Sequence, residues 1–359
     1  MSKLLLIPGL VLALILIAPT FPQLASTLYL NLANTQIAHA SSLPNNAPNR
    51  SILLADADAN LARARSFSNQ PRIELASARI ALARNDAARA VEIFSASGSI
   101  LEYDPIAQFI WANAAWQANQ RDLALAHWRM AGALEYFHQQ MHRAAEKHEW
   151  TEAEQFARIS VGINPDFADG HYILGDALSH LNPNAPDVLR ELDRARELTE
   201  EKELVAAILS RKGEVLAVQN KLRDALDVFS NARRIAPTDA RPRTGYAMAS
   251  LQLDPGAREP SVELLREVVG DSPWYISAYV ALANISGSSA QNSDAQAWLE
   301  LGLQKNPNNP TLLFALGQFY ARQQRPADAR GMLTLATKYE THADSLQAIE
   351  RALAELPAQ

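Results

Sequence analysis

The sequence predicts an all-α fold in which helical hairpins stack one on another along the chain. Of its 359 residues, 48% are hydrophobic and only 7% are aromatic, and with Ala abundant and β-branched runs few this balance favours helix. Short segments such as Asn85-Asp86 and Asn164-Pro165-Asp166 recur between apolar-periodic stretches, where they are typical helix stops and starts. The same residue types also return at a step of about 34 residues, which is typical of a repeat protein.

Residues 1–23 are expected to form a signal-anchor, with residues 4–18 in the membrane. A single formal charge, Lys3, precedes the apolar run from Leu4 to Ala18, a length that suits a short anchor or a signal peptide. The cleavage-like triplet Ala38-His39-Ala40 lies well beyond this run. We therefore expect the segment to stay uncleaved and the rest of the chain to face the extracytoplasmic side. A cleaved signal, which would give a secreted protein, and a buried cytosolic helix are the alternatives.

Residues 24–70 are predicted to form a divergent N-terminal helical hairpin. Leu24 to Ala40 and Ser51 to Phe67 both show helical periodicity, and a Pro- and Asn-rich break at 43–49 separates them. At the other end, residues 342–359 are predicted to form a capping helix, because Ala343 to Leu356 carries one apolar stripe and an otherwise charged surface. Arrays of repeats need such polar-faced ends.

Residues 71–341 are predicted to be the repeat array, and its most regular unit runs from Pro310 to Thr341. Small residues in this unit allow two antiparallel helices to approach closely, and large residues fill the remaining space. The residues concerned are Leu313, Leu316, Gly317 and Tyr320 in the first helix and Ala329, Leu333 and Ala336 in the second. Such a hairpin cannot bury its apolar stripe alone, so copies must stack on it.

Equivalent residue types recur in units that begin at Leu134, Ala168, Ala206 and Ile276, and more weakly at Pro71 and Pro105. The stretch from Ala240 to Asp271 fits only if its two helices are registered separately. The array thus contains about eight units, and their pattern resembles the tetratricopeptide repeat (TPR). The resemblance implies a right-handed α-solenoid and a non-enzymatic scaffold that holds a protein or an extended peptide in a concave groove.

In TPR proteins, positions 2, 5, 9 and 12 of each unit's first helix line the groove. By this resemblance the candidate peptide groove comprises Phe109, Asn113, Trp116, Tyr172, Asp176, Glu214, Asn284, Phe314 and Gln318. For Phe109 and Trp116, packing beneath the preceding repeat is the alternative. TPRs that clamp chaperone C-terminal tails place Lys at position 5, where this chain has Phe109, Tyr172, Ser210, Val280 and Phe314. The resemblance therefore argues against chaperone tails as partners.

Composition and motifs argue against several other functions. The net charge of −6 comes with no basic stripe, which argues against a nucleic-acid partner. The absence of cysteine removes thiol nucleophiles and zinc-thiolate sites. The sequence contains neither a Gly-rich phosphate loop nor a Gly-x-Ser-x-Gly elbow. We therefore expect no enzyme, no catalytic residues and no cofactor.

His138, His142 and Glu146 recur every four residues and so project from one helical face. This spacing could present two imidazoles and a carboxylate to a metal ion. The sequence supplies no further ligand, and His148-Glu149-Trp150 lacks the second histidine of a zinc protease motif. We therefore expect a solvated helix face and no metal site.

Taken with the apolar N-terminus, the repeat array predicts a membrane-tethered, extracytoplasmic scaffold for protein–protein interaction. The alternative is an accessory subunit of cell-envelope polysaccharide synthesis or export, because TPR arrays often accompany a membrane enzyme in such systems.

Overall fold

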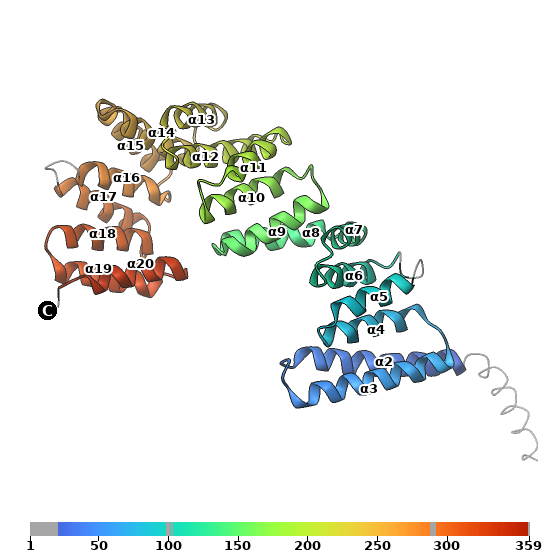
Figure 1. Cartoon of the computed structure of the whole chain (residues 1–359). Helices are drawn as coiled ribbons and strands as arrows, with labels where there is room; N and C mark the ends of the chain where they lie inside the picture. Colours follow the sequence, from blue (N-terminus) through green and yellow to red (C-terminus); the bar gives the residue numbers. More distant parts are fainter. Residues whose placement is uncertain (1–20, 98–100, 102, 288–291, 358–359) are drawn as a thin grey trace, which may run out of the picture. The chain divides into compact units, whose positions relative to one another are not determined.

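The computed structural model describes residues 21–97, 101, 103–287 and 292–357, and all regular secondary structure within these ranges is helical (Figure 1). In this described part of the chain, nineteen α-helices, α2 to α20, follow one another with short connections. Each hairpin pairs two consecutive helices, and hairpin follows hairpin along the chain. The predicted all-α solenoid of stacked helical hairpins is confirmed.

The chain divides into two compact units. The N-terminal unit extends to Tyr136 and includes the short segment Gly162–Asn164, and the C-terminal unit comprises Phe137–Val161 and Pro165–Gln359. The helices up to this division are α2 (Phe21–Ser42), α3 (Pro48–Phe67), α4 (Pro71–Ala83), α5 (Ala87–Ser97), α6 (Pro105–Gln117) and α7 (Arg121–Met130).

The remaining helices belong to the C-terminal unit, apart from the first three residues of α8 and the last two of α9. These are α8 (Leu134–Glu146), α9 (Trp150–Ile163), α10 (Ala168–Leu181), α11 (Pro186–Glu197), α12 (Lys202–Val218), α13 (Leu222–Ile235), α14 (Ala240–Leu253), α15 (Arg258–Asp271), α16 (Ile276–Gly287), α17 (Asn292–Lys305), α18 (Pro310–Arg322), α19 (Pro326–Tyr339) and α20 (Ala343–Ala354). The first helices of successive hairpins touch in series, α10 on α12, α12 on α14, α14 on α16 and α16 on α18. This series is the layer that the TPR resemblance assigns to the groove.

Contacts between small and large residues of paired helices confirm the predicted register of the repeat. In the α12/α13 hairpin, Ala225, Phe229 and Ala232 are all buried. A Cβ atom built on Gly213 would lie 2.6 Å from Cε1 of Phe229, so the two helices approach too closely there for any side chain larger than hydrogen. The glycine of α12 therefore makes room for the phenylalanine of α13.

The stretch from Ala240 required two separate registers because a single-turn 3-10 helix, η2 (Pro255–Ala257), stands between α14 and α15. The side chain of Asp254 accepts a hydrogen bond from the Gly256 amide at 2.8 Å and so stabilises this extra turn. The inserted turn shifts α15 along the sequence but leaves Leu265 and Val268 buried against α14 and α16.

Several turns between paired helices place an asparagine in the left-handed backbone region. Asn85, Asn119 and Asn220 have φ values of 61°, 60° and 59°. Asn tolerates this conformation better than most residues, and a left-handed residue after the last turn of a helix ends that helix. These turn signals in the sequence therefore have a direct conformational cause.

At the chain ends, α2 and α3 pair in the region of the predicted N-terminal hairpin, and α20 lies in the region of the predicted cap. Ile349 of α20 is buried against Leu333 and Ala336 of α19. The predicted anchor at residues 4–18 lies outside the described residues. Among the residues described, no helix combines the length and the apolar character needed to cross a bilayer.

Candidate functional site

Three of the predicted groove residues come together in the C-terminal unit. Tyr172 and Asp176 lie on α10, and Glu214 lies on the neighbouring α12. Two arginines that the sequence analysis did not single out join them, Arg211 from α12 and Arg241 from the first turn of α14. We call these five residues the polar groove cluster. It spans three successive first helices.

Ion pairs link the charged members of the polar groove cluster across the helices. Arg241 donates from Nε and Nη2 to the two carboxylate oxygens of Glu214, at 2.7 and 2.8 Å. Arg211 contacts the same carboxylate through Nη1 at 3.0 Å and pairs through Nε with Oδ1 of Asp176. Bidentate arginine pairs are the stronger and more directional ion pairs. The network therefore holds α10, α12 and α14 in a defined alignment.

The environment favours the charged forms of Glu214 and Arg241. Burial works to raise the pKa of Glu214, but the hydrogen bond from Arg241 and the charges of Arg241 and Arg211 outweigh it, so that this pKa is lowered. Burial likewise works to lower the pKa of Arg241, and the hydrogen bond and charge of Glu214 outweigh it, so that the pKa is raised. Burial raises the pKa of the Tyr172 phenol. Two arginines and two carboxylates lie side by side on the predicted groove layer, with the side chain of Glu214 still 32% exposed.

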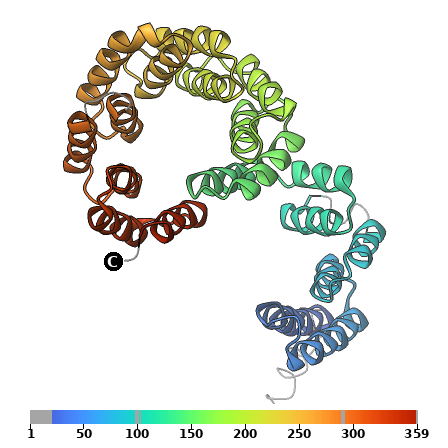
Figure 2. The same cartoon turned by 60° about the vertical axis from the view of Figure 1, so that its left-hand side comes forward.

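A column of stacked rings borders the polar groove cluster. His180 lies 3.8 Å from Asp176 through Nε2 and Oδ1, and its ring stacks on Trp150 with centroids 3.8 Å apart. Trp150 stacks in turn on His148 at 5.3 Å, and His148 stacks on His342 at 4.1 Å. Burial lowers the pKa of both His148 and His180, so the neutral imidazole is favoured at each of them. Through these contacts the segment before α20 meets the α8–α9 turn (Figure 2).

The other predicted groove residues of the C-terminal unit lie apart from this cluster. Asn284 on α16 and Gln318 on α18 are exposed. Phe314 is half-buried and packs into the core formed with Leu313 and Leu333. Their assignment to a peptide groove stays a prediction.

In the N-terminal unit, the three predicted groove residues pack against their own surroundings. Phe109 meets Tyr136 edge-on with centroids 5.4 Å apart. Trp116 lies against Trp128 at 5.2 Å, and the guanidinium carbon of Arg121 lies 3.6 Å from its ring centroid. Asn113 accepts a hydrogen bond from Nε1 of Trp128 at 3.1 Å. These three side chains contribute to the packing of their unit whether or not a partner also binds them.

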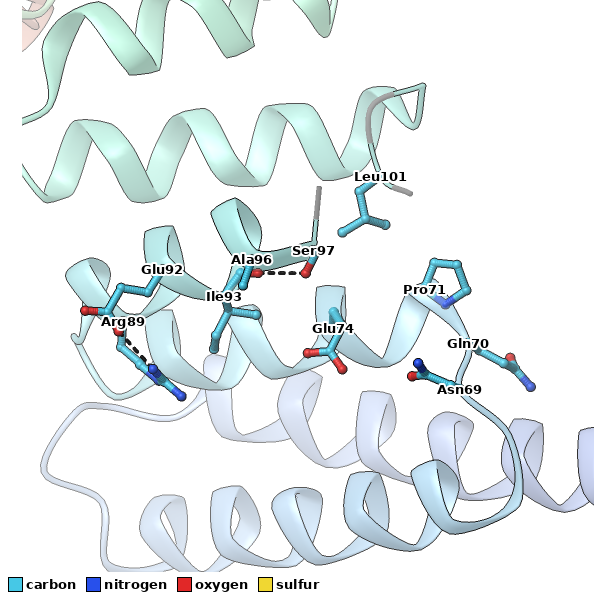
Figure 3. A pocket seen from close by; sticks show the side chains of 10 residues that line it. All are labelled: Asn69, Gln70, Pro71, Glu74, Arg89, Glu92, Ile93, Ala96, Ser97 and Leu101. Carbon is cyan, nitrogen blue, oxygen red and sulfur yellow. Dashed lines mark hydrogen bonds and ion pairs between the residues drawn. The ribbon is translucent and has the colours of Figure 1, made fainter. Parts of the chain in front are cut away.

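Asn113 also lines a hollow of about 590 Å³ in the N-terminal unit, together with Arg50 and Arg79. A second hollow, of about 410 Å³, lies beside α4 and α5 (Figure 3). Its charged lining residues are Glu74, Arg89 and Glu92, and Arg89 pairs with Glu92 at 2.8 Å. No predicted groove residue lines this second hollow.

Sequence reasoning missed Arg211 and Arg241 for different reasons. Arg211 falls outside the four groove positions of its unit. Arg241 occupies position 2 of the unit from Ala240, but η2 breaks the register of that unit and no groove positions were assigned there. If α14 alone had been taken as the first helix of a unit, its position 2 would have identified Arg241 as a groove candidate.

The histidine face of α8 also differs from expectation. His138 and His142 both turn Nε2 toward Oδ2 of Asp169, at 3.0 and 2.6 Å. Asp169 comes from the first turn of α10, in the following repeat. Its hydrogen bond raises the pKa of His142, against the effect of burial. The carboxylate that joins the two imidazoles is therefore not Glu146 of the same helix.

Comparison with known proteins matches neither a protein-family model nor a curated protein. Among solved structures, the chain is similar to a thermophilic TPR protein of Thermus thermophilus, at 16% identity over 52% of this chain and 99% of the other, with a TM-score of 0.44. It is similar to PilW, a type IV pilus biogenesis factor, at 13% identity over 61% and 98%, with a TM-score of 0.45. It is also similar to PilF of Pseudomonas aeruginosa, at 16% identity over 61% and 97%, with a TM-score of 0.42.

Proposed function

We propose that this protein is a non-enzymatic scaffold that binds an extended segment of a partner protein along α10, α12 and α14. The polar groove cluster carries the proposal. It places four charged side chains and a tyrosine on one layer of successive helices, and ion pairs fix their positions. Charges held so firmly on a helical scaffold can recognise a partner without first having to be ordered.

The spacing of the helices suits an extended peptide. Packed helices lie about 8–10 Å apart, and an extended chain advances about 3.3 Å per residue. A peptide laid across the first helices would thus meet a new helix about every three residues. Acidic side chains of the peptide would pair with Arg211 and Arg241, and basic ones with Asp176 and Glu214. A peptide of mixed charge is therefore the expected ligand.

To test this function, binding of the full chain to an array of extended, mixed-charge peptides is measured. The double variant Glu214→Gln with Arg241→Gln removes both charges and keeps a polar side chain at each position. Peptides that bind the wild-type protein should bind this variant at least 10-fold more weakly, because truncating charged partners in a buried network costs about 2 kcal/mol or more. The matched control is Arg325→Gln with Asp328→Asn, which removes an exposed pair at 2.6 Å at the start of α19. Binding that is equal in both double variants, or absent from every peptide, would contradict the proposal.

We further propose that residues 4–18 tether the scaffold to a membrane, with the helical units on the extracytoplasmic side. The apolar run after Lys3, broken only by Pro8 and Gly9, supports this part of the proposal. The native protein should sediment with membranes until detergent is added. A mature protein that begins at Ser41 would contradict the tether. Cross-linking in membranes would then identify the partner, and a polysaccharide synthesis or export enzyme among the products would favour the accessory-subunit alternative.

A further inference from the structure

We propose that His138, His142 and Asp169 form a binding site for a divalent transition-metal ion of the Zn²⁺ class, between α8 and α10. One ligand atom from each residue is available, and the three atoms all lie within 4.8 Å of one another. The site is separate from the polar groove cluster, and its ligand is an ion, not a peptide. It does not depend on the scaffold function.

Two local features bring the imidazoles to one point. The histidines are four residues apart on α8, so they lie on the same face one turn from each other. Asp169 in the first turn of α10 reaches that face from the following hairpin. Each imidazole directs Nε2, and not Nδ1, at the same carboxylate oxygen. Both nitrogens of the pair thus converge on a single position beside an anionic oxygen.

Neighbouring rings hold the two imidazoles in place. The His138 ring meets the His142 ring at 4.8 Å and 77°, and it meets Phe167 at 5.3 Å and 88°. An aromatic contact of this kind limits rotation of the imidazole about its side-chain bonds. The ligand set is therefore largely positioned before any ion binds, which lowers the cost of binding.

The separations come close to what a metal ion requires. Zinc–nitrogen and zinc–oxygen bonds of about 2.0–2.2 Å place neighbouring ligand atoms roughly 3–3.5 Å apart in tetrahedral or octahedral geometry. The two nitrogen–oxygen separations are 3.0 and 2.6 Å. An ion can enter when each neutral imidazole carries its proton on Nδ1, so that the Nε2 lone pair faces the ion. Small side-chain movements then suffice to open the two hydrogen-bonded separations.

The composition of the site selects the class of ion. Two imidazoles and one carboxylate suit Zn²⁺, Ni²⁺, Co²⁺ or Cu²⁺, whereas Mg²⁺ and Ca²⁺ prefer sites made of oxygen ligands. The three side chains remain partly exposed, at 34% for His138, 40% for His142 and 23% for Asp169. Water or a side chain of a partner can therefore complete the coordination.

The test measures Zn²⁺ binding to the purified full chain by competition with a chromophoric chelator, with Co²⁺ absorption as a second probe. We expect about one ion per chain and no competition from Mg²⁺ at equal concentration. His142→Gln and Asp169→Asn should each weaken Zn²⁺ binding at least about 10-fold, because even the outer partners of metal ligands contribute that much. Zn²⁺ should also raise the melting temperature of the wild-type protein, and at the same Zn²⁺ concentration it should raise that of either variant less.

The matched control is His148→Gln, which removes an imidazole from the other histidine cluster of the C-terminal unit, where His148 stacks on His342. This variant should bind Zn²⁺ as the wild-type protein does. Three results would each overturn the site: no Zn²⁺ binding by the wild-type chain, equal affinity in His142→Gln, or an equal loss in His148→Gln. Circular dichroism of the metal-free variants checks that they are folded. If Asp169→Asn unfolds, His138→Gln takes its place with the same expected loss.

Discussion

Replacing Gly245 by alanine should loosen the packing between α13 and α14, although the same change at an exposed helical glycine should stabilise the protein. A Cβ atom on Gly245 would lie 2.4 Å from both Cε1 and Cζ of Phe229. Nonbonded carbon atoms prefer about 3.5–4.0 Å, so the ring must move by more than about 1 Å. It has little room to do so, because Phe229 is 1% exposed and the same edge of its ring lies against Gly213.

Two opposing effects set the change in the free energy of unfolding that Gly245→Ala causes. Overpacking of a well-packed core costs about 1–3 kcal/mol, whereas Gly to Ala within a helix gains about 0.5–1 kcal/mol. We therefore expect Gly245→Ala to lower the free energy of unfolding by about 1–2 kcal/mol. Gly331 on α19 is the control, because a Cβ atom there would meet nothing within 4 Å. Gly331→Ala should raise the free energy of unfolding by about 0.5–1 kcal/mol.

Urea unfolding followed by circular dichroism gives both values, and hydrogen exchange locates the effect. Because repeats couple mainly to their neighbours, faster exchange in Gly245→Ala should be concentrated in α12 to α14 and absent from α18 and α19. Adding Phe229→Leu should relieve the overlap, so the double variant should lose less than the sum of the two single changes. If Gly245→Ala proves as stable as Gly331→Ala, the close approach described above is wrong.

Three further predictions concern a turn, a buried pair and a stacked tryptophan. Asn220→Ala should lower the free energy of unfolding by about 1–2 kcal/mol, since Asn220 has a φ of 59°. Asn220→Gly should leave it unchanged, because glycine adopts this backbone conformation readily. Equal urea midpoints for the two variants would contradict the role of the turn. The hydrogen bond from His171 to Glu191, at 2.7 Å, is the main cause that raises the pKa of His171. The contribution of this hydrogen bond to the free energy of unfolding is present below about pH 6.5 and is lost as the pH rises through the folded-state pKa of His171. Between about pH 6 and about pH 8 the free energy of unfolding should therefore fall more in the wild-type protein than in His171→Gln. Trp116→Ala should lower the melting temperature because it removes the contacts with Trp128 and Arg121; an unchanged melting temperature together with loss of peptide binding would favour the groove interpretation of Trp116.

The hairpins and their internal register could be predicted from the sequence because the signals are local. Close-approach positions such as Gly213 and Ala225 recur at a fixed distance from the turn residues. Helix periodicity and left-handed turn residues act within a few positions along the chain. The structure buries Ala225 and Phe229 where the repeat pattern expected them.

Contacts between repeats could not be predicted from the sequence, because they depend on the tertiary structure. Arg241 meets Glu214 because α14 lies beside α12, and the inserted turn η2 hid this alignment from a repeat of constant length. Asp169 joins His138 and His142 because α10 presents its first turn to the face of α8. Such pairs lie about one repeat apart along the chain, so no local spacing marks them. The periodic pattern of residue types determined which helices form and which faces they bury, but only the stacking of those helices decided which side chains of neighbouring repeats come within bonding distance.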